Sequence, residues 1–417
     1  MANENLESKR WIIAIAAIVM QLSLGTVYAW SVFKKALIAS HGWTETQTQM
    51  TFVLCIGLIG LFCAFGGTIL DKKGPRFTGT LGGILFGAGT ILAGYADHIG
   101  SLWLLYLGYG VIAAIGNAFG YITPIATLVR WFPDKRGLVT GLAVMGFGMG
   151  AFFMGKIAPA NIVSMGVANT FYMWGAIFLV LVTLSAQFYK NPPAGWLPAG
   201  FSPAAGGGAS AADSYETGEA IRTPQWWMLW AMLCLNISAG IGLISQLSPM
   251  AQNVVKLNIP EITPEALAIA GGSILAIASI FNGAGRLFWA WTSDFIGRKG
   301  VFITMFLSQA ILYILFPKIT NQLMFTIIAC YLLACYGGGF ATMPAFAADA
   351  FGPKNIGRIY GIMLTAWGVA GVVGPLIFAR IYEATQSFQG ALYAAAALLA
   401  VGFVIALVYK KPMHRTA

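Results

Sequence analysis

The segment SIFNGAGRLFWAWTSDFIGRKG, residues 279–300, joins a membrane-type helix to a charged loop, and it decides how the rest of the chain is interpreted. Its first part is almost wholly apolar, yet it contains Arg286, and the nearest acid in the segment is Asp294. At 1.5 Å per residue these two residues lie roughly 12 Å apart along a helix, which predicts Arg286 near the middle of a bilayer. An arginine at that depth costs at least ~2.5 kcal/mol to insert, so it calls for a partner or a function.

The composition of the whole chain predicts an all-α membrane protein. Of its 417 residues, 58% are hydrophobic and 9% are charged. About 20 consecutive apolar residues cross a bilayer as one helix. We therefore expect twelve transmembrane helices, approximately over residues 11–33, 48–70, 77–96, 101–128, 137–161, 168–189, 224–251, 264–292, 301–318, 323–348, 357–384 and 389–409.

The net charge of +10 predicts the orientation of the chain in the membrane. Most of the 24 basic residues fall in loops on the side of the two termini, whereas five point to the other side: Lys34, Lys35, Lys156, Lys256 and Lys318. The positive-inside rule then predicts a multi-pass protein of the cell (inner) membrane with both termini in the cytoplasm. This distribution indicates a lipid bilayer as the partner, and no nucleic acid. The apolar stretch that begins at Arg10 is too long for the core of a cleaved signal peptide.

One long polar segment divides the chain. It runs from Lys190 to Thr223 and reads KNPPAGWLPAGFSPAAGGGASAADSYETGEAIRT. Its proline, glycine, alanine and serine are typical of a flexible linker. We expect an N-terminal six-helix bundle over residues 1–189, a cytoplasmic linker over 190–223 and a C-terminal six-helix bundle over 224–417. Thr223 and Pro224 suit the start of the next helix.

The two halves repeat one another. Pro124 and Gly137 recur 220 residues later as Pro344 and Gly357. The loops GGTILDKKGPR (66–76) and WAWTSDFIGRK (289–299) also correspond. Two parallel six-helix repeats, with sites near the midplane between them, are typical of alternating-access transporters.

Several motifs carry a resemblance to a known family. GTILDKKGPR (67–76) resembles the loop motif of the major facilitator superfamily, whose key places are filled by Gly67, Asp71, Lys72, Gly74 and Arg76. Three further features resemble monocarboxylate transporters, in a bacterial branch with oxalate/formate antiporters: RWFPDKRGLVTGLAVMGFGMG (130–150), GTVYAWSVF (25–33) and the pair Asn282-x-x-x-Arg286. The resemblance covers essentially the whole chain outside the linker and tails.

The charged residues of the repeated loops are interpreted as gating residues. An acid at the cytoplasmic end of a helix, followed by Lys or Arg, can pair with neighbouring loops and helix ends and so latch a closed state. We expect this role, without substrate contact, for Asp71, Arg76, Asp294, Arg298 and Arg136.

Arg286 is interpreted as the centre of a substrate site. None of the 14 acids is predicted at the middle of the membrane; Asp349 and Glu383 come nearest, and both belong near helix ends. The natural partner is then an anion that comes and goes, and the planar guanidinium matches the two oxygens of a carboxylate. The alternative is a snorkelling or structurally paired arginine.

Polar and aromatic side chains complete the expected site. Asn282 lies one turn before Arg286 on the same face and can donate to a substrate oxygen, although packing polarity explains it nearly as well. Tyr28, Tyr121, Tyr336 and Phe340 are placed at central depth. The resemblance implies that Tyr121, Tyr336 and Phe340 match aromatic pocket residues of the oxalate/formate antiporter, and that Tyr28 matches a tyrosine of its first helix.

Two departures from the family pattern bear on the substrate. Animal monocarboxylate transporters have a lysine where this chain has Val32 and an aspartate where it has Asn282. The antiporter has a second central lysine where this chain has Trp367, which we expect to line the substrate site. One central cation suits one carboxylate, so we expect a lactate- or pyruvate-like monocarboxylate rather than oxalate.

The expected function is secondary active transport by rocking of two halves around Arg286. The resemblance implies proton-coupled symport, with a proton as the second transported species. Exchange of one anion for another is the alternative, since it needs no proton-binding acid. We expect no metal, cofactor or enzymatic activity, because the five cysteines and three histidines form no ligand or catalytic pattern. A non-transporting sensor is a further alternative.

Overall fold

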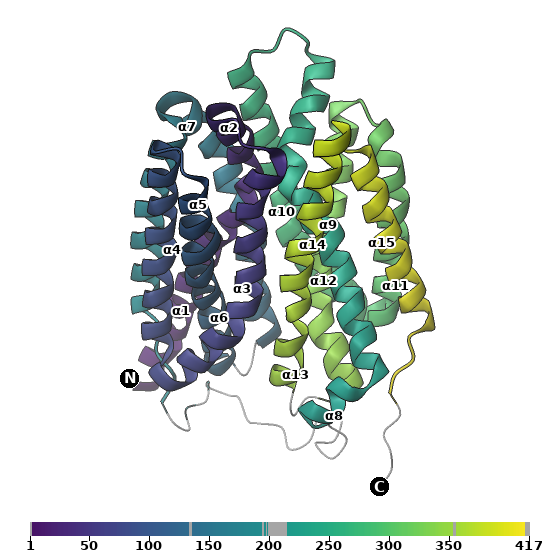
Figure 1. Cartoon of the computed structure of the whole chain (residues 1–417). Coiled ribbons are helices and arrows are strands. Elements are labelled where there is room, and N and C mark those ends of the chain that lie inside the picture. The colour runs from purple at the N-terminus through teal and green to yellow at the C-terminus, as the bar shows by residue number, and fades with distance from the viewer. Residues whose placement is uncertain are drawn as a thin grey trace.

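The computed structural model describes residues 2–132, 136–193, 196, 198, 215–352 and 356–412. Within these ranges every regular element is helical and there is no strand, which confirms the all-α prediction. Figure 1 shows long helices that run roughly side by side, with both chain ends at the same end of the molecule. We call this the terminal end, and the other end the opposite end.

The first half of the chain contains two crossings that are each built from more than one element, and one long element that contains two helices. The elements are α1 Ala2–Gly25, η1 Thr26–Ala29, α2 Trp30–His41, α3 Glu45–Lys73, α4 Pro75–His98, α5 Leu102–Leu105, η2 Tyr106–Ala113, α6 Ala114–Trp131 and α7 Arg136–Gln187. The element η1 is a 3-10 turn that joins α1 to α2, and η2 is a π-helical stretch that joins α5 to α6. In α7 the backbone leaves helical geometry at Gly166, with φ 81°, so α7 comprises two helices.

The second half follows the short helix α8 Thr217–Arg222. Its elements are α9 Pro224–Asn258, α10 Pro264–Ile296, α11 Arg298–Leu315, η4 Phe316–Lys318, α12 Gln322–Phe351, α13 Ile356–Met363, α14 Thr365–Thr385 and α15 Gln389–Val408. In the described chain, 11 stretches are long and apolar enough to cross a membrane, and the one from Gly141 to Gln187 holds the two helices of α7. This agrees with the prediction of twelve transmembrane helices.

Local sequence signals explain where the helices start. The Thr44 side chain and Gln47 form a reciprocal capping box at the start of α3. The Thr223 hydroxyl accepts from the backbone N–H of Trp226 at 3.2 Å, and Pro224 occupies the first turn of α9, as the sequence predicts. These caps satisfy backbone donors that have no partner within their own helix.

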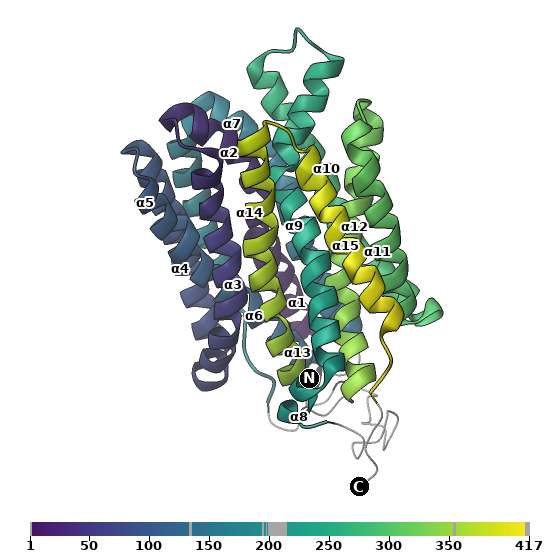
Figure 2. The ribbon, with the colours of Figure 1, turned by 45° about the vertical axis from the view of Figure 1, so that its right-hand side comes forward.

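In the described part of the chain, three pairs of helices make most of the contact between the halves. Helix α7 packs along α10, α3 along α14, and α2 against α9, and Figure 2 shows α3 and α14 side by side. Small residues make the approach close: a Cβ atom on Gly272 would lie 2.3 Å from the carbonyl oxygen of Gly155. A Cβ atom on Gly60 would lie 2.7 Å from the backbone nitrogen of Gly368. Such seams let helices of a membrane protein pack and slide against each other.

Polar contacts between the halves gather at the opposite end. Lys35 Nζ donates to Gln252 Oε1 at 3.0 Å, and Lys156 Nζ donates to Ser273 Oγ at 3.3 Å. Two further side-chain hydrogen bonds join Lys34 to Gln246 and Thr46 to Glu383. These contacts close the seam between the halves at the opposite end.

Candidate binding site

Arg286 of α10 lies deep in the bundle between the halves. Its exposed fraction is 2%, and its Cζ atom lies 5.1 Å from the centroid of the Phe340 ring. Among the described residues no carboxylate forms an ion pair with it, and its buried Nε has no hydrogen-bond partner. The guanidinium interacts with the hydroxyl groups of Tyr28 and Tyr121. The site therefore holds a desolvated positive charge for which the described part of the chain supplies no counter-ion.

Two glycines, one from each half, make room for the side chain of Arg286 because neither has a Cβ atom. A Cβ atom on Gly148 of α7 would lie 2.9 Å from Arg286 Nε. On the other side, a Cβ atom on Gly337 of α12 would lie 3.1 Å from Arg286 Cγ and 2.7 Å from Asn282 Oδ1. Distances this short exclude a larger residue unless a neighbour moves. The slot between these glycines therefore sets the position of the guanidinium.

Asn282 lies beside Arg286, as its place one turn earlier on α10 predicts. Its exposed fraction is 1%, and its Oδ1 atom has no hydrogen-bond partner. A buried amide oxygen in this condition loses the free energy of a hydrogen bond unless a ligand or water supplies a donor. The hydroxyl of a hydroxy acid is one group that could supply it.

Tyr28 is held at the site by the break between α1 and α2. The backbone of Gly25 contacts α7 so closely that a Cβ atom there would lie 2.0 Å from the carbonyl oxygen of Phe147. The 3-10 turn Thr26–Ala29 follows directly and contains Tyr28. The hydroxyl of Tyr336 then donates to the hydroxyl of Tyr28 over 2.8 Å. This hydrogen bond joins the second half of the chain to the first.

Six aromatic side chains form a closed ring of edge-to-face contacts, which we call the aromatic cage. Three come from the first half and three from the second, and none is more than 6% exposed. Successive ring centroids are 5.0–5.8 Å apart in the order Tyr28, Tyr336, Phe340, Trp367, Tyr121, Phe147 and back to Tyr28. Aromatic walls exclude water and strengthen electrostatic attraction to a charge inside.

The structure brings all seven of the predicted substrate-binding residues together: Arg286, Asn282, Tyr121, Tyr336, Tyr28, Phe340 and Trp367. Arg286 Nε and the indole Nε1 of Trp367 are buried donors without partners. Phe147 is a member of the cage that the sequence analysis did not single out. It lies inside the resembling segment 130–150, but an apolar residue between glycines gives no signal beyond packing.

The predicted gating residues lie apart from the cage, at the terminal end. Arg298 forms ion pairs with Asp294 at 2.6 Å and with Asp349 at 3.3 Å. Both partners belong to the second half, and the Asp349 contact was not predicted. Arg76 is exposed. The side chains of Asp71 and Arg136 lie outside the described residues.

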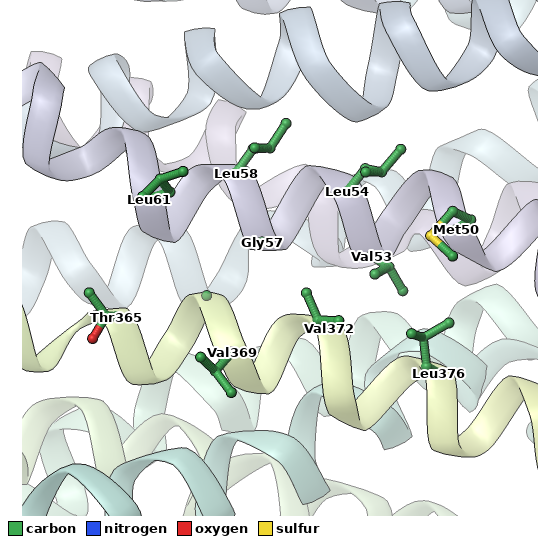
Figure 3. A pocket seen from close by; sticks show the side chains of 11 residues that line it. Met50, Val53, Leu54, Gly57, Leu58, Leu61, Thr365, Val369, Val372 and Leu376 are labelled. Atoms are coloured by element: carbon green, nitrogen blue, oxygen red, sulfur yellow. The ribbon is translucent and has the colours of Figure 1, made fainter. Parts of the chain in front are cut away.

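A cavity of about 500 Å³ lies between α3 and α14, and no residue of the cage lines it (Figure 3). Its walls are apolar side chains such as Met50, Leu54 and Leu376. Its one hydroxyl, on Thr365, already donates to the carbonyl oxygen of Ile362 at 2.8 Å. Without a charge or a free donor, this cavity does not suit an anion.

Fold and site together define a class of protein: a multi-span helical membrane protein with a buried cation between two halves. The profile of the Major Facilitator Superfamily matches residues 11–281 and 267–417. The chain therefore belongs to the Major Facilitator Superfamily of membrane transporters.

Individual relatives agree with this assignment. The chain is 28% identical to the oxalate:formate antiporter of Oxalobacter formigenes, over 88% of this chain and 84% of the antiporter. It is 27% identical to the uncharacterized MFS-type transporter YhjX of Escherichia coli, over 89% and 88% of the two chains. Its fold is similar to a bacterial homologue of the human lysosomal transporter Spinster in an inward-facing, unoccupied conformation, with a TM-score of 0.73, 16% identity and 96% of both chains covered.

Proposed function

We propose that this transporter moves a small monocarboxylate, of the lactate or pyruvate type, by alternating access around Arg286. The observation that carries the proposal is a buried guanidinium that has no carboxylate partner among the described residues and lies against an aromatic cage to which both halves contribute. A carboxylate can accept two hydrogen bonds from the guanidinium fork and neutralise its charge. Tyr28 and Tyr121, which already interact with Arg286, can donate to the same anion.

The division of the cage between the halves suggests how binding is coupled to transport. When the halves separate at one end, the walls part and the anion enters. Once bound, it removes the net charge that opposes closing an apolar seam around the site. The ligand then favours the closed arrangement because it contacts both halves there, and a ligand shifts an equilibrium only by such differential contacts.

The cage supports one carboxylate better than two. Trp367, the residue at the place of the antiporter's second lysine, contributes an apolar wall and one N–H donor. A dicarboxylate would leave its second charge against aromatic rings without a cation, at a high desolvation cost. Relatives named for monocarboxylates are consistent with this choice: monocarboxylate transporter 14 of Mus musculus and apicoplast pyruvate carrier 1 of Toxoplasma gondii.

Proton symport is the coupling that we propose, and anion exchange is the alternative. Symport agrees with the resemblance to monocarboxylate transporters. Exchange is favoured by Asn282, since an amide stands where a proton-carrying carboxylate is expected. Either mode keeps the net charge of each transport cycle balanced.

We further propose the arrangement of the chain in the cell (inner) membrane. The basic loops place the terminal end in the cytoplasm by the positive-inside rule, and the opposite end outside. Residues 1–189 and 224–417 then form the two moving bundles, joined by a cytoplasmic linker over 190–223. The charged loops are assigned to gating at the cytoplasmic face, through Asp71, Arg76, Asp294, Arg298 and Arg136.

Uptake of radiolabelled lactate by proteoliposomes tests the proposal. The wild-type protein is expected to accumulate lactate above the level of protein-free liposomes, and Arg286→Gln protein is expected to remain at that level. Absence of lactate and pyruvate uptake by correctly folded wild-type protein would exclude this substrate class.

A further inference from the structure

A second buried cation lies between the halves, nearer the opposite end. Lys34 of α2 is 1% exposed, although the sequence suggested only an outward-facing basic residue. Its ammonium group pairs with the carboxylate of Glu45 and donates to the amide oxygen of Gln246. Glu45 begins α3 in the first half, whereas Gln246 belongs to α9 in the second. Lys34 therefore bridges the seam and holds a carboxylate in the closed state.

Lys34 lies in line with the cage. From Tyr28 to Lys34 the chain rises roughly 10 Å toward the opposite end. In the second half, the Tyr336 ring packs against Gly240, and Gln246 lies roughly 9 Å further along α9 in the same direction. The Lys34–Gln246 contact is thus the next layer above the Tyr28–Tyr336 hydrogen bond. An anion that enters between the halves from the opposite end would therefore meet the Lys34–Gln246 contact before it reaches Arg286.

The surroundings of Lys34 provide further hydrogen-bond donors. Gln246 is fully buried, and its amide Nε2 has no hydrogen-bond partner. The hydroxyl of Ser31, one turn before Lys34, is also buried without a partner. An ammonium with such neighbours can bind a carboxylate, which is the group that Glu45 presents here.

This position differs from the one at which animal monocarboxylate transporters have their lysine, which corresponds to Val32. Two residues along a helix turn the side chain by about 200°, so the two positions belong to different faces of α2. Val32 instead lines a cavity together with Lys35 and Gln252.

We infer that Lys34 is a second carboxylate-binding site, through which the substrate passes between the opposite end and Arg286. Glu45 and Gln246 occupy it while this end is closed. When the halves separate at this end, Gln246 moves away with the second half. Lys34 then loses one hydrogen-bond acceptor and comes into contact with water. An incoming carboxylate then replaces Gln246 and shares the ammonium with Glu45. The inference rests on the proposed function, since it assumes a carboxylate substrate.

Protection of an introduced thiol tests this site apart from Arg286. Ser31→Cys places a thiol one turn from Lys34, and Arg286→Gln in the same chain removes the central site. A membrane-impermeant thiol reagent is added from outside, with lactate or with sodium chloride at equal concentration. At a lactate concentration of roughly ten times its dissociation constant, labelling should slow by about tenfold, because only the unoccupied fraction of the sites can react. Adding Lys34→Gln should abolish this protection, and Lys34→Arg should retain it.

Lys35→Gln is the matched control, because it removes the neighbouring charge and another hydrogen bond to the second half. Protection should persist in this variant. The inference is overturned if the thiol is never labelled, if chloride protects as well as lactate, or if protection survives Lys34→Gln. Uptake by the protein with no substitution is measured in parallel. Normal uptake without thiol protection rejects the Lys34 site alone, whereas absence of uptake rejects the proposed function.

Discussion

The hydroxyl of Tyr336 donates to the hydroxyl of Tyr28 over 2.8 Å, and this bond links the two halves of the transporter beside Arg286. Both side chains are buried. Under the proposed function a bound carboxylate would compete for these hydroxyls, and the bond would then couple substrate binding to the contact between the halves.

Removal of single hydroxyl groups tests this coupling. Tyr336→Phe and Tyr121→Phe keep the rings of the cage but remove a donor. A hydrogen bond to a charged group contributes about 1.5–3 kcal/mol, so lactate affinity should fall about tenfold or more in each variant. Tyr95→Phe, on an exposed tyrosine of α4, is the control. Unchanged binding in both cage variants would assign these tyrosines to packing alone.

The slot between Gly148 and Gly337 predicts that a small added side chain lowers the affinity for lactate while the protein still folds. The methyl group of Gly148→Ala would lie 2.9 Å from Arg286 Nε and should displace the guanidinium from the cage. Gly361→Ala adds a methyl group with no atom within 4 Å and serves as the control. Lactate titration and thermal unfolding of both purified variants should show weaker binding for Gly148→Ala at a similar Tm. Equal affinities would remove Gly148 from the account.

Trp367 predicts how the choice of substrate can be changed. Trp367→Lys puts a second cation into the cage, where it lacks a partner when a monocarboxylate is bound. Lactate transport should fall, and oxalate, which carries a charge for each cation, should begin to compete with the remaining uptake. Trp367→Phe keeps an aromatic wall and should retain lactate transport. If oxalate competes equally well with lactate uptake by the wild type and by Trp367→Lys, Trp367 does not determine the net charge of the substrate that is accepted.

The coupling mode predicts a response to proton gradients. An inward proton gradient should drive lactate accumulation in proteoliposomes that contain no transportable anion. Dissipating the gradient with a protonophore is the control and should end accumulation. If uptake occurs only after internal loading with an anion, exchange replaces symport.

The fold was predictable from the sequence because hydropathy reports the length of apolar segments directly. The details within the crossings were not. The 3-10 turn at Thr26–Ala29 and the π-helical stretch Tyr106–Ala113 lie in segments whose hydropathy is that of ordinary helix. Their backbone geometry depends on tertiary packing, such as the contact of Gly25 with α7. The short helix α8 likewise lies in a segment whose composition suggested only a linker.

The sequence predicted the candidate site through Arg286, because a charged residue near the middle of a bilayer is costly and therefore calls for an explanation. Phe147 escaped notice because one more phenylalanine in an apolar helix is typical of packing. Lys34 was assigned to the outside by counting charges. In the structure it is buried and donates to Gln246, 212 residues further along the chain, and the periodicity of one helix carries no information on such a pairing.

Lactate binding by purified Arg286→Gln protein tests the central claim most directly. Glutamine removes the charge and the fork but also the desolvation cost, so the variant should fold and insert at least as well as the wild type. Size-exclusion chromatography and thermal unfolding establish that it is folded, and calorimetric titration then measures binding. The account predicts no binding at lactate concentrations that saturate the wild type, and severe impairment in Arg286→Lys. Wild-type affinity in folded Arg286→Gln protein would show that the arginine is structural and that the substrate site lies elsewhere.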